Sequence, residues 1–192
     1  MRVTKNGDFF SKDTNTIISS ISGIATIIAS IIAILTLLIW RKQQLYSEKF
    51  RILMELEDSY ELLFNQYYEN FNWFYQIFKL SLEATEQNTK LIHDKIIKDF
   101  EQFKMINQSA VYEKNYQLSY ARATRLDIGI ELIESLKFEK LKSFSTDNMN
   151  MLNNDNFSSE AQKEELNHKF ANNFCKLKNE GHEHFKKIRK SI

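Results

Sequence analysis

The chain contains no proline, only four glycines and a single cysteine among its 192 residues. Sheet proteins and nucleotide-binding α/β folds need Gly and Pro at many tight turns, so a chain poor in both is more easily built from a few long helices. One cysteine, Cys175, excludes a disulfide within the chain and fits a reducing compartment. We interpret it as a small apolar residue beside Phe174 and Leu177. The formal net charge of +1 gives no field that favours nucleic acid, which is therefore an unlikely partner.

The sequence also lacks the short motifs that carry chemistry: a glycine-rich phosphate loop, HExxH, CxxC or a nucleophile elbow. The best metal-binding candidate is weak, because Glu165 and His168 form one E-x-x-H unit and di-iron helical proteins use two. His182 and His184 are two residues apart, so on a helix they point to different faces. We therefore expect no catalytic residues, no cofactor and no metal, and a protein that is not an enzyme.

A long uncharged run, from Ile17 to Trp40, stands near the start of the chain. As a helix it would be about 36 Å long, enough to cross a hydrocarbon core of about 30 Å with some tilt. Trp40 suits the membrane interface, and Arg41 and Lys42 stop the span. A cleaved signal peptide is the alternative, but the run exceeds the usual apolar region of about 7–15 residues and no small-x-small site follows. We predict a short tail over 1–16, one transmembrane helix over 17–40 and a helical soluble domain over 41–192.

The charges that flank this run give a weak preference for one orientation. Basic residues before the run are Arg2, Lys5 and Lys12; those after it are Arg41, Lys42, Lys49 and Arg51. The adjacent Arg41-Lys42 pair and the lone cysteine favour a cytoplasmic domain. We expect a single-pass protein of the cell inner membrane with its N-terminus outside.

Small or weakly polar residues recur through the run at spacings of 3, 4, 3, 4 and 3. They are Ser19, Ser22, Thr26, Ala29, Ala33 and Thr36. In lipid, small residues let helix backbones approach closely and hydroxyls can bond across helices. This stripe predicts a helix-association face and a homo-oligomer; the alternative is an ordinary Ser- and Ala-containing span.

No Gly or Pro interrupts the chain between Arg41 and Leu82. The residues that follow a heptad pattern there are Tyr46, Phe50, Leu53, Tyr60, Phe64, Tyr67, Phe71, Phe74 and Phe78, with Glu57 as the one polar member. This pattern predicts a long helix, continuous with the span, that packs at coiled-coil angles. A base-stacking surface is the alternative for these dense aromatics, but Lys79 is the only basic residue between Tyr60 and Leu82, so core packing is favoured.

The remaining chain predicts more helices and two connections. Ser81–Asn88 has the composition of a turn, and a second helical region is expected from about Thr89 to Phe144, weakened at Asn107–Ser109. Ser143–Ser158 is rich in Asn, Ser and Asp and predicts a loop. Arg122 and Arg125 are expected on a solvated face or in ion pairs.

A last helix is expected to begin after a capping pair, Ser159 and Gln162. Its apolar stripe comprises Leu166, Phe170, Phe174, Leu177, Phe185, Ile188 and Ile192. It ends in a basic tail of Lys186, Lys187, Arg189 and Lys190. Cations there favour the end of a helix, although an acidic partner or an anionic surface is an alternative.

The run from Ile17 to Phe50, with its Ile-rich span and the following WRKQQLYSEKF, resembles uncharacterised bacterial single-pass membrane proteins. Those have an N-terminal anchor and a cytoplasmic helical domain. The resemblance implies topology and no activity.

Together these features predict an all-α chain: an N-terminal transmembrane helix that continues into a long antiparallel helical bundle. The leading functional hypothesis is a membrane-anchored interaction or regulatory protein that self-associates or holds a protein partner at the cytoplasmic face. The alternative is a membrane-perturbing effector, such as a toxin or defence protein, whose span assembles in the lipid bilayer.

Overall fold

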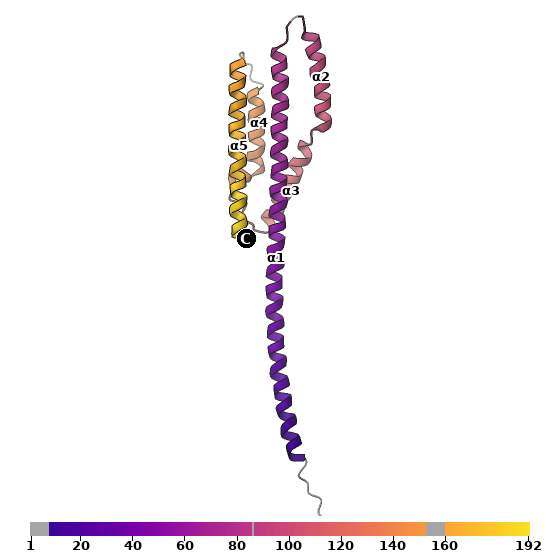
Figure 1. Cartoon of the computed structure of the whole chain (residues 1–192), viewed down its shortest axis with the longest axis vertical. Coiled ribbons are helices and arrows are strands. Elements are labelled where there is room, and N and C mark those ends of the chain that lie inside the picture. Colours follow the sequence, from indigo (N-terminus) through magenta and orange to yellow (C-terminus); the bar gives the residue numbers. More distant parts are fainter. Residues whose placement is uncertain (1–7, 86, 153–159) are drawn as a thin grey trace, which may run out of the picture. The chain divides into compact units, whose positions relative to one another are not determined.

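A computed structural model of the chain describes residues 8–85, 87–152 and 160–192. Its elements are α1 (Asp8–Leu82), α2 (Thr89–Ile106), α3 (Ser109–Arg125), the 3₁₀ turn η1 (Glu134–Leu136), α4 (Phe138–Leu152) and α5 (Glu160–Ser191) (Figure 1). Every element in these ranges is helical, so the predicted all-α class is confirmed.

The chain divides into two compact units, Met1–Ser47 and Glu48–Ile192, called unit 1 and unit 2 below. The described part of unit 1 is helical from Asp8 onward and belongs to α1. By length and composition its apolar stretch can cross a membrane, and none of that stretch is buried. The helix begins before Ile17, earlier than the predicted span.

The core of unit 2 forms mainly between α1 and α5. From α1 it takes Leu53, Leu56, Tyr60, Leu63, Phe64, Tyr67 and Phe71, and from α5 Leu166, Phe170, Phe174, Phe185 and Ile188. The middle of the predicted α1 heptad and most of the α5 stripe are thus buried, as expected. The start of the heptad is not buried, because Tyr46 and Phe50 are exposed. Near its end Phe74 is exposed, whereas Phe78 packs against the core.

Ring contacts show how α1 and α5 pair within unit 2. Phe71 stacks on Phe170 with ring centroids 3.5 Å apart, and Tyr60 meets Phe185 edge-on at 5.4 Å. Later residues of α1 therefore contact earlier residues of α5. Offset and edge-on aromatic pairs add to the stabilisation that burial itself supplies.

The second helical region is not the single helix expected to about Phe144. α2 ends at Ile106, α3 starts at Ser109, and the break falls at the predicted weak point. After Arg125 the chain turns, because Asp127 and Gly129 adopt positive φ angles of 52° and 81°, which a helix does not allow. Apolar residues on both sides of this turn are buried, which is why they resembled one continuous stripe.

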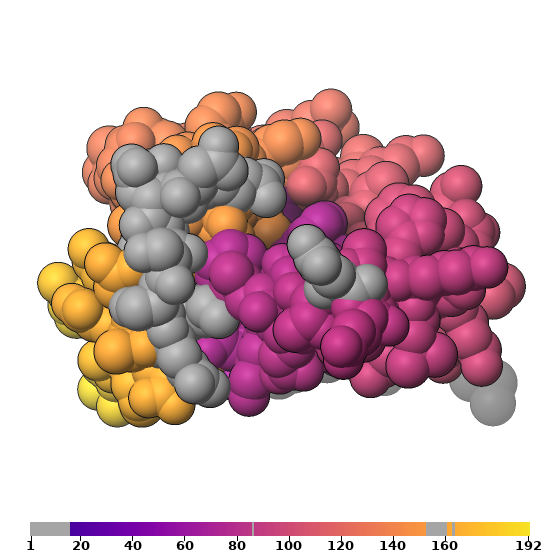
Figure 2. All heavy atoms as spheres, turned by 90° about the horizontal axis from the view of Figure 1, so that it is seen from above, coloured from indigo at the N-terminus to yellow at the C-terminus, as the bar shows by residue number. Residues whose placement is uncertain are grey.

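α2 is the least buried helix of unit 2. Figure 2 shows it on the opposite side of α1 from α4 and α5. Phe103 is its one buried residue, and its ring stacks on Trp73 of α1 with centroids 4.2 Å apart. Leu91 and Met105 of the same helix remain 75% and 80% exposed.

The loop predicted over Ser143–Ser158 was wrong at its beginning, because α4 continues to Leu152. Asn148 is buried, and its side-chain amide donates to the carbonyl oxygen of Phe144, so it remains compatible with helix. The rest of the predicted loop, together with the Ser159 cap, lies outside the described residues. α5 begins at Glu160.

Candidate functional site

The apolar stretch of unit 1 exposes its large side chains on every face of the helix. The isoleucines and leucines between Ile17 and Ile39 are between 52 and 62% exposed, and Trp40 is 53% exposed. The six residues of the predicted association face are also exposed, as are Arg41 and Lys42. The contact of this face with another helix, and the placement of Trp40, Arg41 and Lys42 at a membrane interface, stay predictions.

Hydroxyl groups in this stretch bond to their own helix. Thr26 donates to the carbonyl oxygen of Ser22 and Thr36 to that of Ile32, both at 2.8 Å. Ser30, off the stripe, donates in the same way to Thr26. The donors of Thr26 and Thr36 are therefore already satisfied within their own helix, and Ala29 and Ala33 between them have small side chains that permit close packing.

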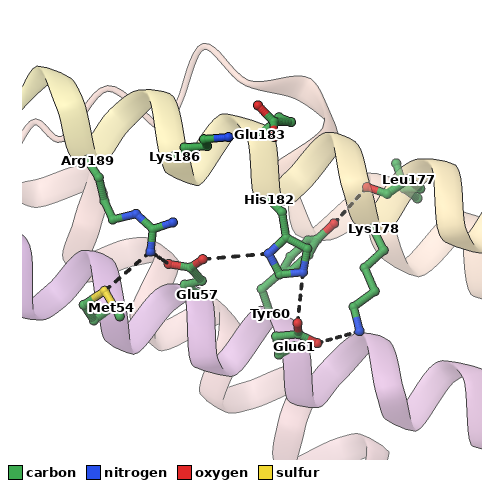
Figure 3. Close-up of polar contacts among 10 residues, drawn as sticks. All are labelled: Met54, Glu57, Tyr60, Glu61, Leu177, Lys178, His182, Glu183, Lys186 and Arg189. Atoms are coloured by element: carbon green, nitrogen blue, oxygen red, sulfur yellow. Dashed lines mark hydrogen bonds and ion pairs between the residues drawn. The ribbon is translucent and has the colours of Figure 1, made fainter.

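A polar network joins α1 and α5 in unit 2 (Figure 3). The Glu57 carboxylate, whose side chain is 13% exposed, accepts a hydrogen bond from the Arg189 guanidinium at 2.8 Å. His182 Nε2 lies 2.9 Å from Glu61 Oε1, and its Nδ1 lies 3.8 Å from Glu57 Oε1. Lys178 Nζ completes the row, 2.7 Å from Glu61 Oε2.

This network links α1 to α5 through interhelical ion pairs. Three nitrogen-bearing side chains of α5 face two carboxylates of α1, one turn apart. Charge-assisted hydrogen bonds of this kind fix the pairing of two helices more than they add stability, since half-exposed ion pairs are screened. The sequence offered one signal, the polar Glu57 inside an apolar heptad, but no sign of its partner.

The basic tail does not form one free cluster. Arg189 is held by Glu57, and Lys186 Nζ lies 3.4 Å from Glu183 Oε1. Lys187 and Lys190 are exposed, and neither pairs with an acidic group within the described ranges. Arg122, expected in an ion pair, lies 3.4 Å from Glu55, while Cys175 is exposed rather than packed beside Phe174 and Leu177.

A second polar cluster secures the break between α2 and α3. Asn70 of α1, 8% exposed, donates to Ser109 Oγ at 2.7 Å and accepts from the amide of Gln66 at 2.9 Å. Gln66 in turn accepts from the backbone N–H of Gln108, and Asn107 from that of Ser109. These bonds cap the otherwise unpaired start of α3.

Buried phenols complete the polar contacts of the core. Tyr60 donates to the carbonyl oxygen of Leu177, Tyr67 to Glu113, and Tyr116 to the carbonyl oxygen of Leu136. Burial raises the pKa of all three phenols well above the ordinary value, and neighbouring carboxylates raise the pKa of Tyr60 and Tyr67 further. Each hydroxyl therefore stays protonated as a structural donor.

Within the described part of the chain, no group of three His, Cys, Asp or Glu side chains is placed to hold a metal ion. Glu165 and His168 are both exposed on α5.

Comparison of the chain with protein-family models, with curated proteins and with solved structures gave no match.

Proposed function

We propose that the chain is a membrane-anchored helical protein of the cell inner membrane. In this proposal Ile17–Trp40 spans the bilayer once, and unit 2 is an antiparallel helical bundle on the cytoplasmic side. The exposed isoleucines and leucines of unit 1 carry the proposal, because leaving so many uncovered in water is costly at roughly 1.5–3 kcal/mol for each side chain. A hydrocarbon core covers all of them, and the helix satisfies its own backbone.

The role of this anchor is to let the protein self-associate, or hold a partner, at the cytoplasmic face. Ala29 and Ala33 support self-association, because their small side chains lie one turn apart and leave room for a second helix backbone. The hydroxyls of Thr26 and Thr36 on the same face are bonded internally, so burying them against another helix leaves no donor unpaired.

The topology is tested with the native cysteine, which is exposed on α5. In intact cells, Cys175 should resist a membrane-impermeant maleimide and react after the cells are opened. A variant with Asn6→Cys and Cys175→Ser should already be labelled in intact cells, because its thiol precedes the span. Ready labelling of Cys175 in intact cells would contradict the cytoplasmic placement of unit 2.

The association face is tested by enlarging it. Ala29→Leu with Ala33→Leu keeps the span apolar but crowds the face, and should weaken oligomers in a membrane two-hybrid or crosslinking assay. Ile27→Leu with Ile31→Leu is the control, because these residues lie on the opposite side of the helix. Equal association of the Ala29/Ala33 variant and the wild type would rule out the stripe. Loss of membrane potential on overexpression that also needs Ala29 and Ala33 would favour an effector instead.

A further inference from the structure

The turn between α3 and η1, residues 126–133, presents one leucine to solvent while burying two isoleucines. Ile128 and Ile130 are 5% and 0% exposed, whereas Leu132 is 92% exposed. The turn is held in place: Lys49 Nζ donates to the carbonyl oxygen of Asp127 at 3.3 Å. An ordered turn thus projects Leu132 away from the core.

The last turn of α5 lies at the same end of unit 2. Arg189 of this last turn pairs with Glu57 of α1, and Lys49, about two turns earlier on α1, donates to the Asp127 carbonyl oxygen in the turn. Lys187 and Lys190 project from this last turn and make no ion pair with any described residue. Leu132 and two uncommitted cations therefore share one end of unit 2.

Basic and acidic residues are unevenly distributed between this end of unit 2 and the rest of it. The segments 48–57, 122–137 and 182–192, which form this end, hold nine basic and seven acidic residues. The remainder of unit 2 holds twelve basic and sixteen acidic residues. One end is thus net positive and the rest net negative, so an anionic surface attracts this end and repels the other.

The covalent chain keeps this end within reach of a bilayer. Lys49 follows Trp40 by nine residues. Nine residues span about 30 Å when fully extended and less in any folded form. With Ile17–Trp40 in the membrane, the backbone of Lys49 stays within that distance of Trp40, and the turn lies one lysine side chain beyond it.

We propose that Leu132 and the last turn of α5 form a lipid-docking surface, in which Leu132 enters the headgroup layer and Lys187 and Lys190 bind anionic lipid headgroups. The proposal rests on the membrane anchor proposed above. Apolar wedges flanked by cations are the usual chemistry of interfacial binding. Glu131 and Glu134 flank Leu132 and oppose this attraction, so the docking depends on the two lysines.

A bilayer fits this surface better than a protein partner does. A stable protein interface buries about 800 Å² on each partner, and one projecting leucine supplies little of that area. A lipid surface needs no complementary shape, and the anchor already provides its proximity. The proposed occupant is therefore a bilayer that contains anionic lipid.

The test uses the full chain with Cys175→Ser, reconstituted at one copy per nanodisc, and a nitroxide label at Leu132→Cys. Accessibility to oxygen and to a water-soluble nickel chelate is measured in phosphatidylcholine discs with and without phosphatidylglycerol. We expect the label to become oxygen-accessible and chelate-protected when phosphatidylglycerol is present. Lys187→Gln and Lys190→Gln should each lower the docked population about fivefold.

Two reference labels make the outcomes distinguishable. A label at Leu91→Cys, on exposed α2, should remain accessible to the chelate in both lipids. A label at Ile28→Cys reports on the span: if it is protected while the Leu132 label behaves like the Leu91 label, the anchor stands and the docking is wrong. If the Ile28 label is accessible to the chelate, the anchor itself fails. Protection of the Leu132 label without oxygen access, in either lipid, would indicate contact with protein and also overturn the docking.

Discussion

The phenol ring of Tyr60 lies against the backbone of Gly181, in space that any other side chain would occupy. A Cβ atom at position 181 would stand 2.2 Å from Tyr60 Oη and 2.4 Å from its Cζ. From this position the Tyr60 hydroxyl donates to the carbonyl oxygen of Leu177 at 3.1 Å. Gly181 therefore sets how closely α1 and α5 approach. Its lack of a side chain makes room for the Tyr60 ring.

Replacing Gly181 with alanine should destabilise the protein by about 1–3 kcal/mol, because Tyr60 is fully buried and has no room to move. The measurement is thermal or denaturant unfolding followed by circular dichroism in detergent. Gly23→Ala is the matched control, since nothing lies within 4 Å of its added Cβ and alanine favours helix. A gain in stability for Gly181→Ala would mean that the two helices separate easily.

Removing the charge of Glu57 should lower the free energy of unfolding by about 1–2 kcal/mol, because its nearly buried carboxylate binds Arg189. The change is Glu57→Gln, measured by the same unfolding experiment. Glu48→Gln is the control; its partner Arg51 is exposed, and no measurable loss is expected. The double variant Glu57→Gln with Arg189→Gln should lose less free energy of unfolding than the two single variants lose together. Strictly additive losses would show that Glu57 and Arg189 do not interact.

Asn70→Ala should destabilise by about 1–3 kcal/mol, because it leaves buried partners at the α2–α3 break without hydrogen bonds. Amide hydrogen exchange should speed up first at the start of α3, which this cluster caps. Asn65→Ala is the control, because Asn65 is exposed on the same helix and accepts its hydrogen bond from Lys178 of α5, not from the start of α3. Uniform acceleration across unit 2 would show that Asn70 has no local role.

The buried phenols predict alkaline unfolding. Their pKa in the folded protein is raised above the ordinary value of about 10, so the folded state favours the protonated form. The free energy of unfolding should hold below about pH 10 and fall as the pH rises further, since the unfolded phenols ionise there. Part of the phenolate absorbance at 295 nm should appear only as helical circular dichroism is lost. Full ionisation with helix retained would contradict this.

Much of the fold followed from sequence periodicity, and each of the two main errors has a physical cause. The stripe from Leu166 to Ile192 and the middle of the α1 heptad were predictable because burial repeats with the helix period. The turn after Arg125 was not, because Leu126, Ile130 and Ile133 have the helical spacings of four and three although the chain turns between the first two. The start of the loop at Ser143 was also missed, since Asn148 satisfies its side chain within α4.

A candidate site could be predicted from the sequence only where all its residues lie on one helix. The small-residue stripe lies on one helix and is visible in the sequence, although its contact with another helix stays a prediction. The network of Glu57, His182 and Arg189 joins residues more than 120 positions apart, and no local pattern pairs them. Leu132 was missed because an exposed leucine in an apolar run resembles a buried one.

The distance in sequence between Tyr60 and Leu177 has a consequence for synthesis. They are 117 positions apart, so at about 5–20 residues per second the ribosome needs about 6–23 s to make the partner of α1 after α1 itself. During that interval the aromatic face of α1 has no α5 to cover it. A nascent chain in this state is a substrate for chaperones, and slowing translation upstream of residue 160 should increase its aggregation or degradation.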